Sequence, residues 1–174
     1  MSKTFMYFAY GSNLLTKRLH VQNPSAVKRG CGKLKDFQLD FNYYSKRWKG
    51  AAATIVPKEG AYVWGAIYEI DNEHIPSLDN QEGVHDNVYF PLEVDVETPE
   101  GAFTKCRVYQ QCNNPPVCDN LANLPDDRKP SAVYLNLIRR GAVESNLPED
   151  YVKFLHNIAD NGYDGEVDVK MNIT

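Results

Sequence analysis

The first two-thirds of the chain have the residue pattern of β-strands. Residues 6–10 form a continuous apolar run, and residues 34–43 alternate between apolar and polar side chains. Continuous runs are typical of strands buried on both faces, and alternation is typical of strands buried on one face. Two further pairs of runs predict hairpins around turn-forming segments at 57–60 and 99–101: 51–56 with 62–70, and 88–97 with 103–110.

Helix signals lie near both ends of the chain and once in the middle. Ser12 is a suitable N-cap for a helix that includes Leu14, Leu15 and Leu19. Further helices are predicted at 72–78, at 131–143 with Ser131 as N-cap, and at 148–159 after an initial proline. The element order predicts an α+β fold, with a mostly antiparallel sheet that could close into a barrel.

The segment 112–130 separates the predicted strands from the last two helices. It is polar and contains four prolines. Loops of this length inside small domains are often functional or mobile.

Composition narrows the class of protein. At 174 residues we expect one domain, 1–174. A net charge of -4 argues against nucleic-acid or anionic-membrane binding. No segment has the length of a membrane-spanning helix and the first residues lack a secretory signal's apolar run, so we expect a cytoplasmic protein. The cysteines and histidines match no common zinc pattern, so we expect no metal. We expect free thiols in a reducing compartment, although Cys112 and Cys118 flank a Pro-Pro turn and could meet.

The junction Tyr10-Gly11-Ser12-Asn13 is the first candidate site. A buried strand is predicted to end at the glycine and to lead directly into a helix. Such a junction directs several backbone N–H groups at one point, which suits a carboxylate, a phosphate or a developing oxyanion. The same residues also fit an ordinary strand-to-helix turn, which is the commoner case for this pattern alone.

Two carboxylates and one tyrosine are further candidates. Glu82 stands where a predicted helix ends at Gly83, and Asp79 competes with it on equal terms. Acidic loop residues are usually solvated surface. Tyr134 either packs in the core or directs its hydroxyl into a cleft. Nucleophilic-serine, phosphate-loop, dinucleotide and HExxH motifs are absent, so no cofactor is implied.

Segments spread over nearly the whole chain resemble the γ-glutamylcyclotransferase family, especially its animal members. The first is Tyr7-Phe8-Ala9-Tyr10-Gly11-Ser12-Asn13-Leu14. The others follow in the family's order: 23–26, 34–37, 53–55, 63–65, 78–84, 147–151 and 163–165. The ordered set is more specific than its first member alone. The resemblance implies a small mixed β-barrel with flanking helices, and homodimers occur in that family.

The resemblance also implies an activity and its residues. The family converts an L-γ-glutamyl amino acid to 5-oxo-L-proline and the free amino acid. By resemblance, Glu82 is the proton acceptor and Tyr134 contacts the substrate. The loop that binds the substrate consists of Tyr7, Phe8, Ala9, Tyr10, Gly11 and Ser12.

These residues suit the implied chemistry. The substrate's own α-amine attacks its γ-carbonyl, so the enzyme needs a base and oxyanion donors but no nucleophile. Ordinary glutamate and α-amine pKa values differ by roughly 3.5 units, which makes an unperturbed carboxylate too weak a base by about 5 kcal/mol. We therefore expect Glu82 in a partly desolvated cleft.

Two alternatives stay open. A cyclotransferase for another γ-glutamyl donor, such as a γ-glutamylamine or glutathione, would recognise the first half of its substrate identically. A non-catalytic module that binds an acidic metabolite would keep the loop but would have no need of Glu82.

Overall fold

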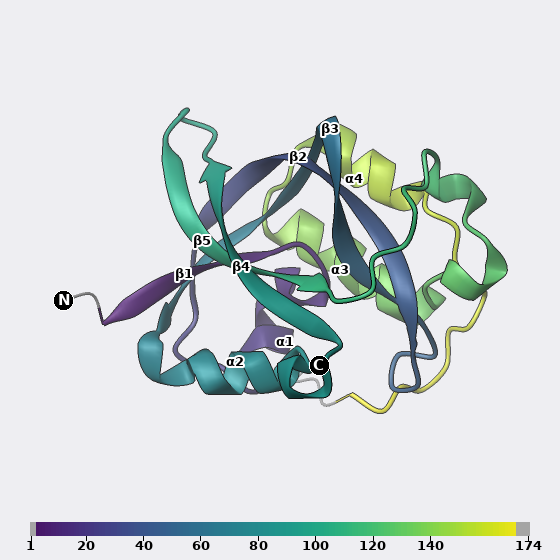
Figure 1. Cartoon of the computed structure of the whole chain (residues 1–174), viewed down its shortest axis with the longest axis horizontal. Coiled ribbons are helices and arrows are strands. Elements are labelled where there is room, and N and C mark those ends of the chain that lie inside the picture. The colour runs from purple at the N-terminus through teal and green to yellow at the C-terminus, as the bar shows by residue number, and fades with distance from the viewer. Residues whose placement is uncertain (1–2, 170–174) are drawn as a thin grey trace.

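A closed barrel of five strands forms the centre of the protein, and helices flank it (Figure 1). The computed structural model describes residues 3–169. The strands are β1 (Thr4–Ala9), β2 (Val27–Ser45), β3 (Gly50–Asp71), β4 (Tyr89–Glu97) and β5 (Phe103–Gln111). Their order around the barrel is β1-β3-β2-β4-β5. β1 and β5 pair in parallel and the other pairs are antiparallel, which confirms the predicted mixed, mostly antiparallel barrel.

The helices follow the predicted order. They are α1 (Thr16–His20), α2 (Ile75–Gln81), α3 (Ala132–Glu144) and α4 (Glu149–His156). Short 3-10 turns occupy Ser12–Leu14, Asn72–His74, Val84–Asp86, Leu121–Asn123 and Asp126–Arg128. The Ser131 hydroxyl caps α3 by accepting a hydrogen bond from the Tyr134 N–H, as its sequence signal indicates. No helix within residues 3–169 is long and apolar enough to span a bilayer.

The predicted hairpin turn at 57–60 is wrong. β3 runs through this segment, and its true hairpin with β2 turns between Ser45 and Gly50. Tyr62 pairs with Lys35 and Pro57 pairs with Phe37, so residues 58–61 bulge outward opposite a single residue of β2. The chain on both sides of the turn signal keeps the same partner strand, and the signal therefore produces a bulge instead of a reversal.

The prediction of Ser12 as a helix N-cap is also wrong. Gly11 precedes a 3-10 turn at Ser12–Leu14, and α1 starts only at Thr16. Leu15 between them is extended, with φ -83° and ψ 110°. Leu14 and Leu15 are both buried, so the packing of these side chains decides the local backbone here over capping preference.

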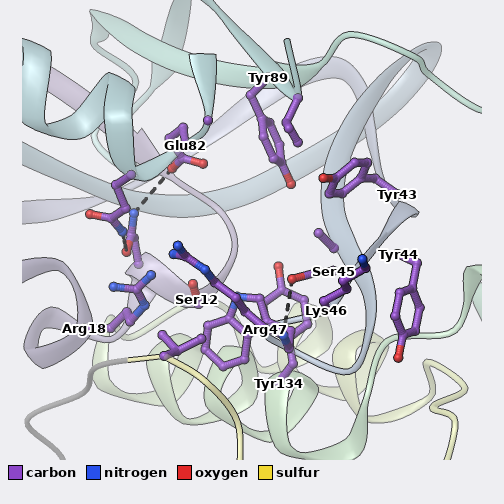
Figure 2. Close-up of a pocket in the computed structure, with 17 residues that line it drawn as sticks. Ser12, Arg18, Tyr43, Tyr44, Ser45, Lys46, Arg47, Glu82, Tyr89 and Tyr134 are labelled. Atoms are coloured by element: carbon purple, nitrogen blue, oxygen red, sulfur yellow. Dashed lines mark hydrogen bonds between the residues drawn. The ribbon is translucent and has the colours of Figure 1, made fainter. Parts of the chain in front are cut away.

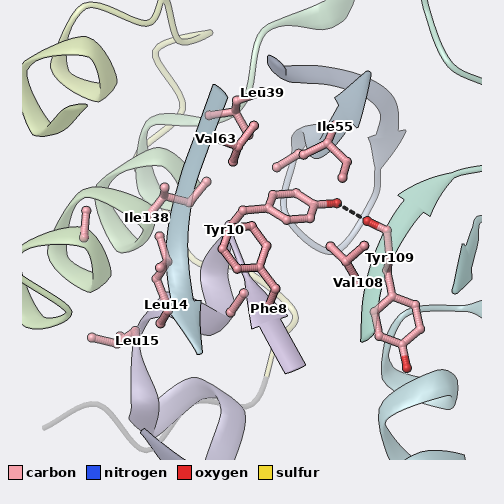
Figure 3. Close-up of a cluster of buried hydrophobic side chains, with 14 of the residues drawn as sticks. Phe8, Tyr10, Leu14, Leu15, Leu39, Ile55, Val63, Val108, Tyr109 and Ile138 are labelled. Atoms are coloured by element: carbon pink, nitrogen blue, oxygen red, sulfur yellow. Dashed lines mark hydrogen bonds between the residues drawn. The ribbon is translucent and has the colours of Figure 1, made fainter. Parts of the chain in front are cut away.

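The core fills the barrel and the space beneath α3 (Figure 3). Phe8, Tyr10 and Ile55 belong to it, and the Tyr10 hydroxyl donates a hydrogen bond of 2.6 Å to the Tyr109 carbonyl. Gly141 lets α3 approach closely, because a Cβ there would lie 2.6 Å from the Leu15 nitrogen. The four cysteines form no disulfide with one another in the structure.

Candidate active site

Two adjoining cavities meet where β1 and α2 end. The inner cavity, of about 40 Å³, is bounded by Tyr7, Tyr10, Gly11, Tyr109 and other residues. The outer cavity, of about 460 Å³, extends past α1 and the turn between β2 and β3 (Figure 2). Both share five residues: Ser12, Asn13, Glu82, Tyr89 and Tyr134.

Glu82 is held at this junction by the end of α2. Its N–H donates to the Leu78 carbonyl, and Gly83 follows with a φ of +72°, which favours glycine. The Tyr7 hydroxyl and the Asn13 amide lie 3.3 Å and 3.5 Å from Glu82 Oε1, as donors. The helix end therefore fixes the backbone and leaves the carboxylate facing the cavities.

The pKa of Glu82 suits proton transfer near neutral pH. Burial raises this pKa to about 7, against the opposing effects of the Arg18 charge and the Tyr7 hydrogen bond. A carboxyl group in this range can both accept and return a proton at physiological pH. The expected desolvation of Glu82 is present.

Asp79 has a different environment from Glu82. Its carboxylate forms an ion pair of 2.8 Å with Arg107 and accepts a hydrogen bond from the Tyr109 hydroxyl. Asp79 bounds neither cavity in the described residues. Of the two competing carboxylates, Glu82 is the one with access to a ligand.

A chain of side-chain amides joins the first 3-10 turn to α2. The Asn13 amide donates to the Tyr7 hydroxyl at 3.0 Å, and Asn13 Oδ1 accepts from Gln81 at 2.9 Å. Gln81 in turn accepts a hydrogen bond of 3.0 Å from Asn23. These bonds position Tyr7 and Glu82 relative to the Gly11 turn.

The predicted loop divides into residues at the cavity and residues in the core. Tyr7, Tyr10, Gly11 and Ser12 bound the inner cavity. Phe8 is fully buried in the core, and Ala9 pairs with Ala66 of β3. The roles predicted for Phe8 and Ala9 therefore stay predictions, without a side chain at the cavity to support them.

Backbone donors are available at the Gly11 turn. Within residues 3–169, the N–H groups of Gly11 and Ser12 donate no hydrogen bond to another group of the protein. A Cβ built on Gly11 would lie 3.7 Å from the Tyr134 hydroxyl. These two N–H groups and that hydroxyl thus lie around one small space, where an anionic oxygen could be bound.

Tyr134 and Tyr89 both form hydrogen bonds with the backbone of Ala53, one with its N–H group and the other with its carbonyl group. The Tyr134 hydroxyl accepts a hydrogen bond of 2.9 Å from the Ala53 N–H, and Tyr89 donates to the Ala53 carbonyl. Among the described residues, the proton of the Tyr134 hydroxyl has no acceptor. Tyr134 is thus both a packed core residue and a free donor at the cavity, which combines the two roles that its sequence left open.

No metal-binding set can be assigned. Within residues 3–169, no three His, Cys, Asp or Glu side chains are grouped so that they could hold an ion.

Comparison with known proteins agrees with this site and fold. The model of the AIG2-like family matches residues 62–155. The γ-glutamylcyclotransferases of Bos taurus and Homo sapiens are 43% and 40% identical to the chain over 169 residues, which is 95% of this chain and 84% of each relative. The chain belongs to the AIG2-like, γ-glutamylcyclotransferase family. The resemblance inferred from the sequence motifs is confirmed.

A solved member of the family has the same fold. A structure named gamma-glutamyl cyclotransferase superposes with a TM-score of 0.85 at 39% identity, and the match covers 94% of this chain and 93% of that one. The barrel with its flanking helices is therefore the fold of this family.

Many residues at the cavities were not among the predicted site residues of this family member, and Asn13, Arg18 and Tyr89 are three examples. Asn13 lies inside the quoted loop motif, so the motif itself contained its signal. Arg18 occupies a buried position beside Leu19, where a charge is unusual, and this was a readable signal as well. Tyr89 begins a strand and had no signal that separated it from core tyrosines.

Proposed function

We propose that this protein is a γ-glutamylcyclotransferase that converts an L-γ-glutamyl amino acid to 5-oxo-L-proline and the free amino acid. The observation on which this rests is a desolvated Glu82 beside the unpartnered N–H groups of Gly11 and Ser12. The sequence identity to relatives of this name supports the same activity.

The proposed reaction has two stages. In the first, Glu82 takes a proton from the substrate's α-ammonium group, and the freed amine attacks the γ-carbonyl carbon to form a five-membered ring. In the second, Glu82 returns that proton to the leaving nitrogen as the original amide C–N bond breaks. The ring nitrogen also loses its extra proton, which ends on the released amine as its ammonium group. The N–H groups of Gly11 and Ser12, with the Tyr134 hydroxyl, bind the substrate's α-carboxylate and the oxyanion.

The magnitude of the pKa shift decides whether Glu82 can be the base. An ordinary glutamate would accept the α-ammonium proton at a cost of about 5 kcal/mol. With a pKa of about 7, Glu82 lies within roughly one unit of an α-amine, and the cost falls to about 1 kcal/mol. A module that only binds an acidic metabolite would gain nothing from this environment, because a desolvated carboxylate repels an anion.

Two further properties of the protein are its cellular location and its oligomeric state. We propose a cytoplasmic location, supported by its four free thiols. A homodimer remains a prediction from the family resemblance, and sedimentation of the purified chain would measure it.

Glu82→Gln tests the proposed activity. The amide keeps the shape of the side chain but has no basicity, so 5-oxoproline formation from γ-glutamylalanine should fall by about 100- to 10,000-fold. Glu73→Gln is the matched control, because Glu73 is exposed and precedes the same helix. A folded Glu82→Gln protein with near wild-type turnover would contradict the role of Glu82.

A further inference from the structure

The side chain of Arg18 is a buried cation that forms no hydrogen bond within residues 3–169. It is 8% exposed, and it lies on the buried face of α1 beside Leu19. Its Nε atom has no hydrogen-bond partner, and within residues 3–169 its guanidinium makes no ion pair. Its guanidinium lies over the ring of Trp48, 5.9 Å from the ring centroid. Leaving a buried guanidinium unpaired is costly, which suggests that a ligand pairs with it.

A second arginine faces the same space. Arg47 is exposed on the turn between β2 and β3, and its side chain extends toward Arg18 (Figure 2). Both arginines bound the outer cavity and a smaller cavity next to it. Burial and the nearby Arg47 charge both lower the pKa of Arg18, while Glu82 raises it. Two cations that repel one another across a cavity form a site for an anion.

No carboxylate within residues 3–169 forms an ion pair with Arg18 or Arg47. Glu82 lies beyond ion-pairing distance of both arginines, within the set of described residues. Asp168 bounds the smaller cavity, and its N–H donates a hydrogen bond of 3.1 Å to the Arg47 carbonyl. Its exposed carboxylate forms an ion pair with neither arginine within the described residues. The guanidinium groups are therefore available to an external anion that enters the cavity.

The position of this pair identifies which part of a substrate it meets. In the proposed function, on which this inference rests, the γ-glutamyl half fills the inner cavity beside Glu82. The group on the far side of the scissile amide bond must then lie in the outer cavity. In an α-amino acid leaving group, a carboxylate lies two bonds from the leaving nitrogen.

We propose that Arg18, assisted by Arg47, binds the α-carboxylate of the leaving amino acid and so determines which γ-glutamyl donors are used. Guanidinium groups match the planar shape of a carboxylate and bind it through paired hydrogen bonds. The released amine of a γ-glutamylamine has no such carboxylate, and glutathione places its carboxylate one residue farther away. The pair thus selects α-amino acids as leaving groups over both alternatives.

A pair of substrates isolates the carboxylate. γ-Glutamylalanine and γ-glutamylethylamide have leaving groups that differ only by that carboxylate, and kcat/KM for 5-oxoproline formation is measured for each. The wild-type protein should prefer γ-glutamylalanine by about 10- to 100-fold, the usual range for a hydrogen bond to a charged group. Arg18→Gln should remove this preference by slowing γ-glutamylalanine alone.

Two variants serve as checks on Arg18→Gln. Arg47→Gln changes an exposed side chain and so should fold normally, and it should reduce the preference in part. Lys17→Gln removes the same charge from an exposed neighbour on α1 that bounds neither cavity, and it should leave the preference unchanged. If Arg18→Gln does not fold, Arg47→Gln decides the question.

The opposing outcomes are distinct. Equal wild-type kcat/KM for the two substrates would overturn the carboxylate site while leaving the cyclotransferase activity in place. An equal loss on both substrates in Arg18→Gln, with the pH profile moved to higher pH, would mean that Arg18 acts only through Glu82. No 5-oxoproline from either substrate would instead overturn the proposed function itself.

Discussion

At the scale of single residues, the site depends on polar groups that the fold leaves incompletely paired. Glu82 is desolvated, and Arg18 and the Gly11 N–H group lack hydrogen-bond partners within residues 3–169. Each of these costs stability in the unliganded protein. In the proposed function, the protein gives up some stability to keep a base, a cation and an oxyanion donor available to the substrate.

Glu82→Gln should stabilise the protein at high pH. The folded-state pKa of Glu82, about 7, lies above its ordinary value of 4.5, so folded molecules bind more protons between these pH values. Ionising Glu82 thus costs no stability below about pH 4.5 and the full amount above pH 7. The Gln variant should gain about 2–3 kcal/mol at pH 8 and almost nothing at pH 4.5, as measured by urea unfolding. An equal gain at both pH values would refute the raised pKa.

Tyr134→Phe should lower both stability and activity. The variant leaves the Ala53 N–H without its acceptor, at a cost of about 1–3 kcal/mol, and removes a hydroxyl proton offered at the Gly11 turn. Because stability falls in either role, melting temperature alone cannot separate packing from substrate contact.

The kinetics of Tyr134→Phe make that separation. We expect kcat/KM to fall by about 10- to 100-fold for a lost hydrogen bond to a charged oxygen. Ile138→Val is the control, because this buried residue of the same helix bounds neither cavity, and the change should cost about 0.5–1.5 kcal/mol. A similar loss of activity in both variants would assign Tyr134 to packing only.

At the scale of elements, α3 holds the backbone that follows the Gly11 turn in place. Gly141 allows α3 to touch the backbone at Leu14 and Leu15, directly after the Gly11 turn. The Ser145 hydroxyl at the end of α3 also donates a hydrogen bond of 3.2 Å to the Leu14 carbonyl. The helix that contains Tyr134 thus also positions the N–H groups of the loop.

Gly141→Ala should destabilise the protein although alanine favours helix. The gain in helix propensity is about 1 kcal/mol, but the new methyl would lie 2.6–2.7 Å from backbone atoms that cannot move aside easily. Overpacking of this kind costs about 1–3 kcal/mol or more. This cost should exceed the gain in helix propensity, so the variant should be less stable than the wild type. Val143→Ala, at an exposed site of α3, is the control in thermal unfolding. A higher melting temperature for Gly141→Ala would contradict this close packing.

At the scale of the whole molecule, the barrel brings three distant parts of the chain to one end. The Gly11 turn, Glu82 after α2, and Tyr134 on α3 all bound the same cavities. In the proposed reaction the substrate supplies its own nucleophile, so this arrangement needs only to orient the substrate and to transfer a proton.

The whole reaction therefore requires a free α-amine on the substrate. N-acetyl-γ-glutamylalanine has no basic nitrogen to attack the γ-carbonyl, so alanine release should be at least about 100-fold slower than from γ-glutamylalanine. Chromatography of the products would measure it. Release of alanine from both substrates at similar rates would indicate hydrolysis by water and would overturn the proposed cyclisation.

Much of the local structure was determined by the sequence. The apolar run at 6–10 and the alternation at 34–43 predicted strands that exist, because burial of one or both faces imposes those periods. Ser131 and Pro148 marked the starts of α3 and α4, because capping acts within a few residues. The ordered motifs also identified the family, and they singled out Glu82 and the Gly11 loop.

The tertiary structure decided what depends on distant neighbours. Continuous pairing with β2 turned the predicted reversal at 57–60 into a bulge, and burial of Leu14 and Leu15 displaced the helix that Ser12 would have capped. Only the folded chain distinguishes Glu82, desolvated at the cavities, from Asp79, which Arg107 neutralises from β5. The reason is physical: burial and charge pairing depend on distances in space, which a linear pattern does not contain.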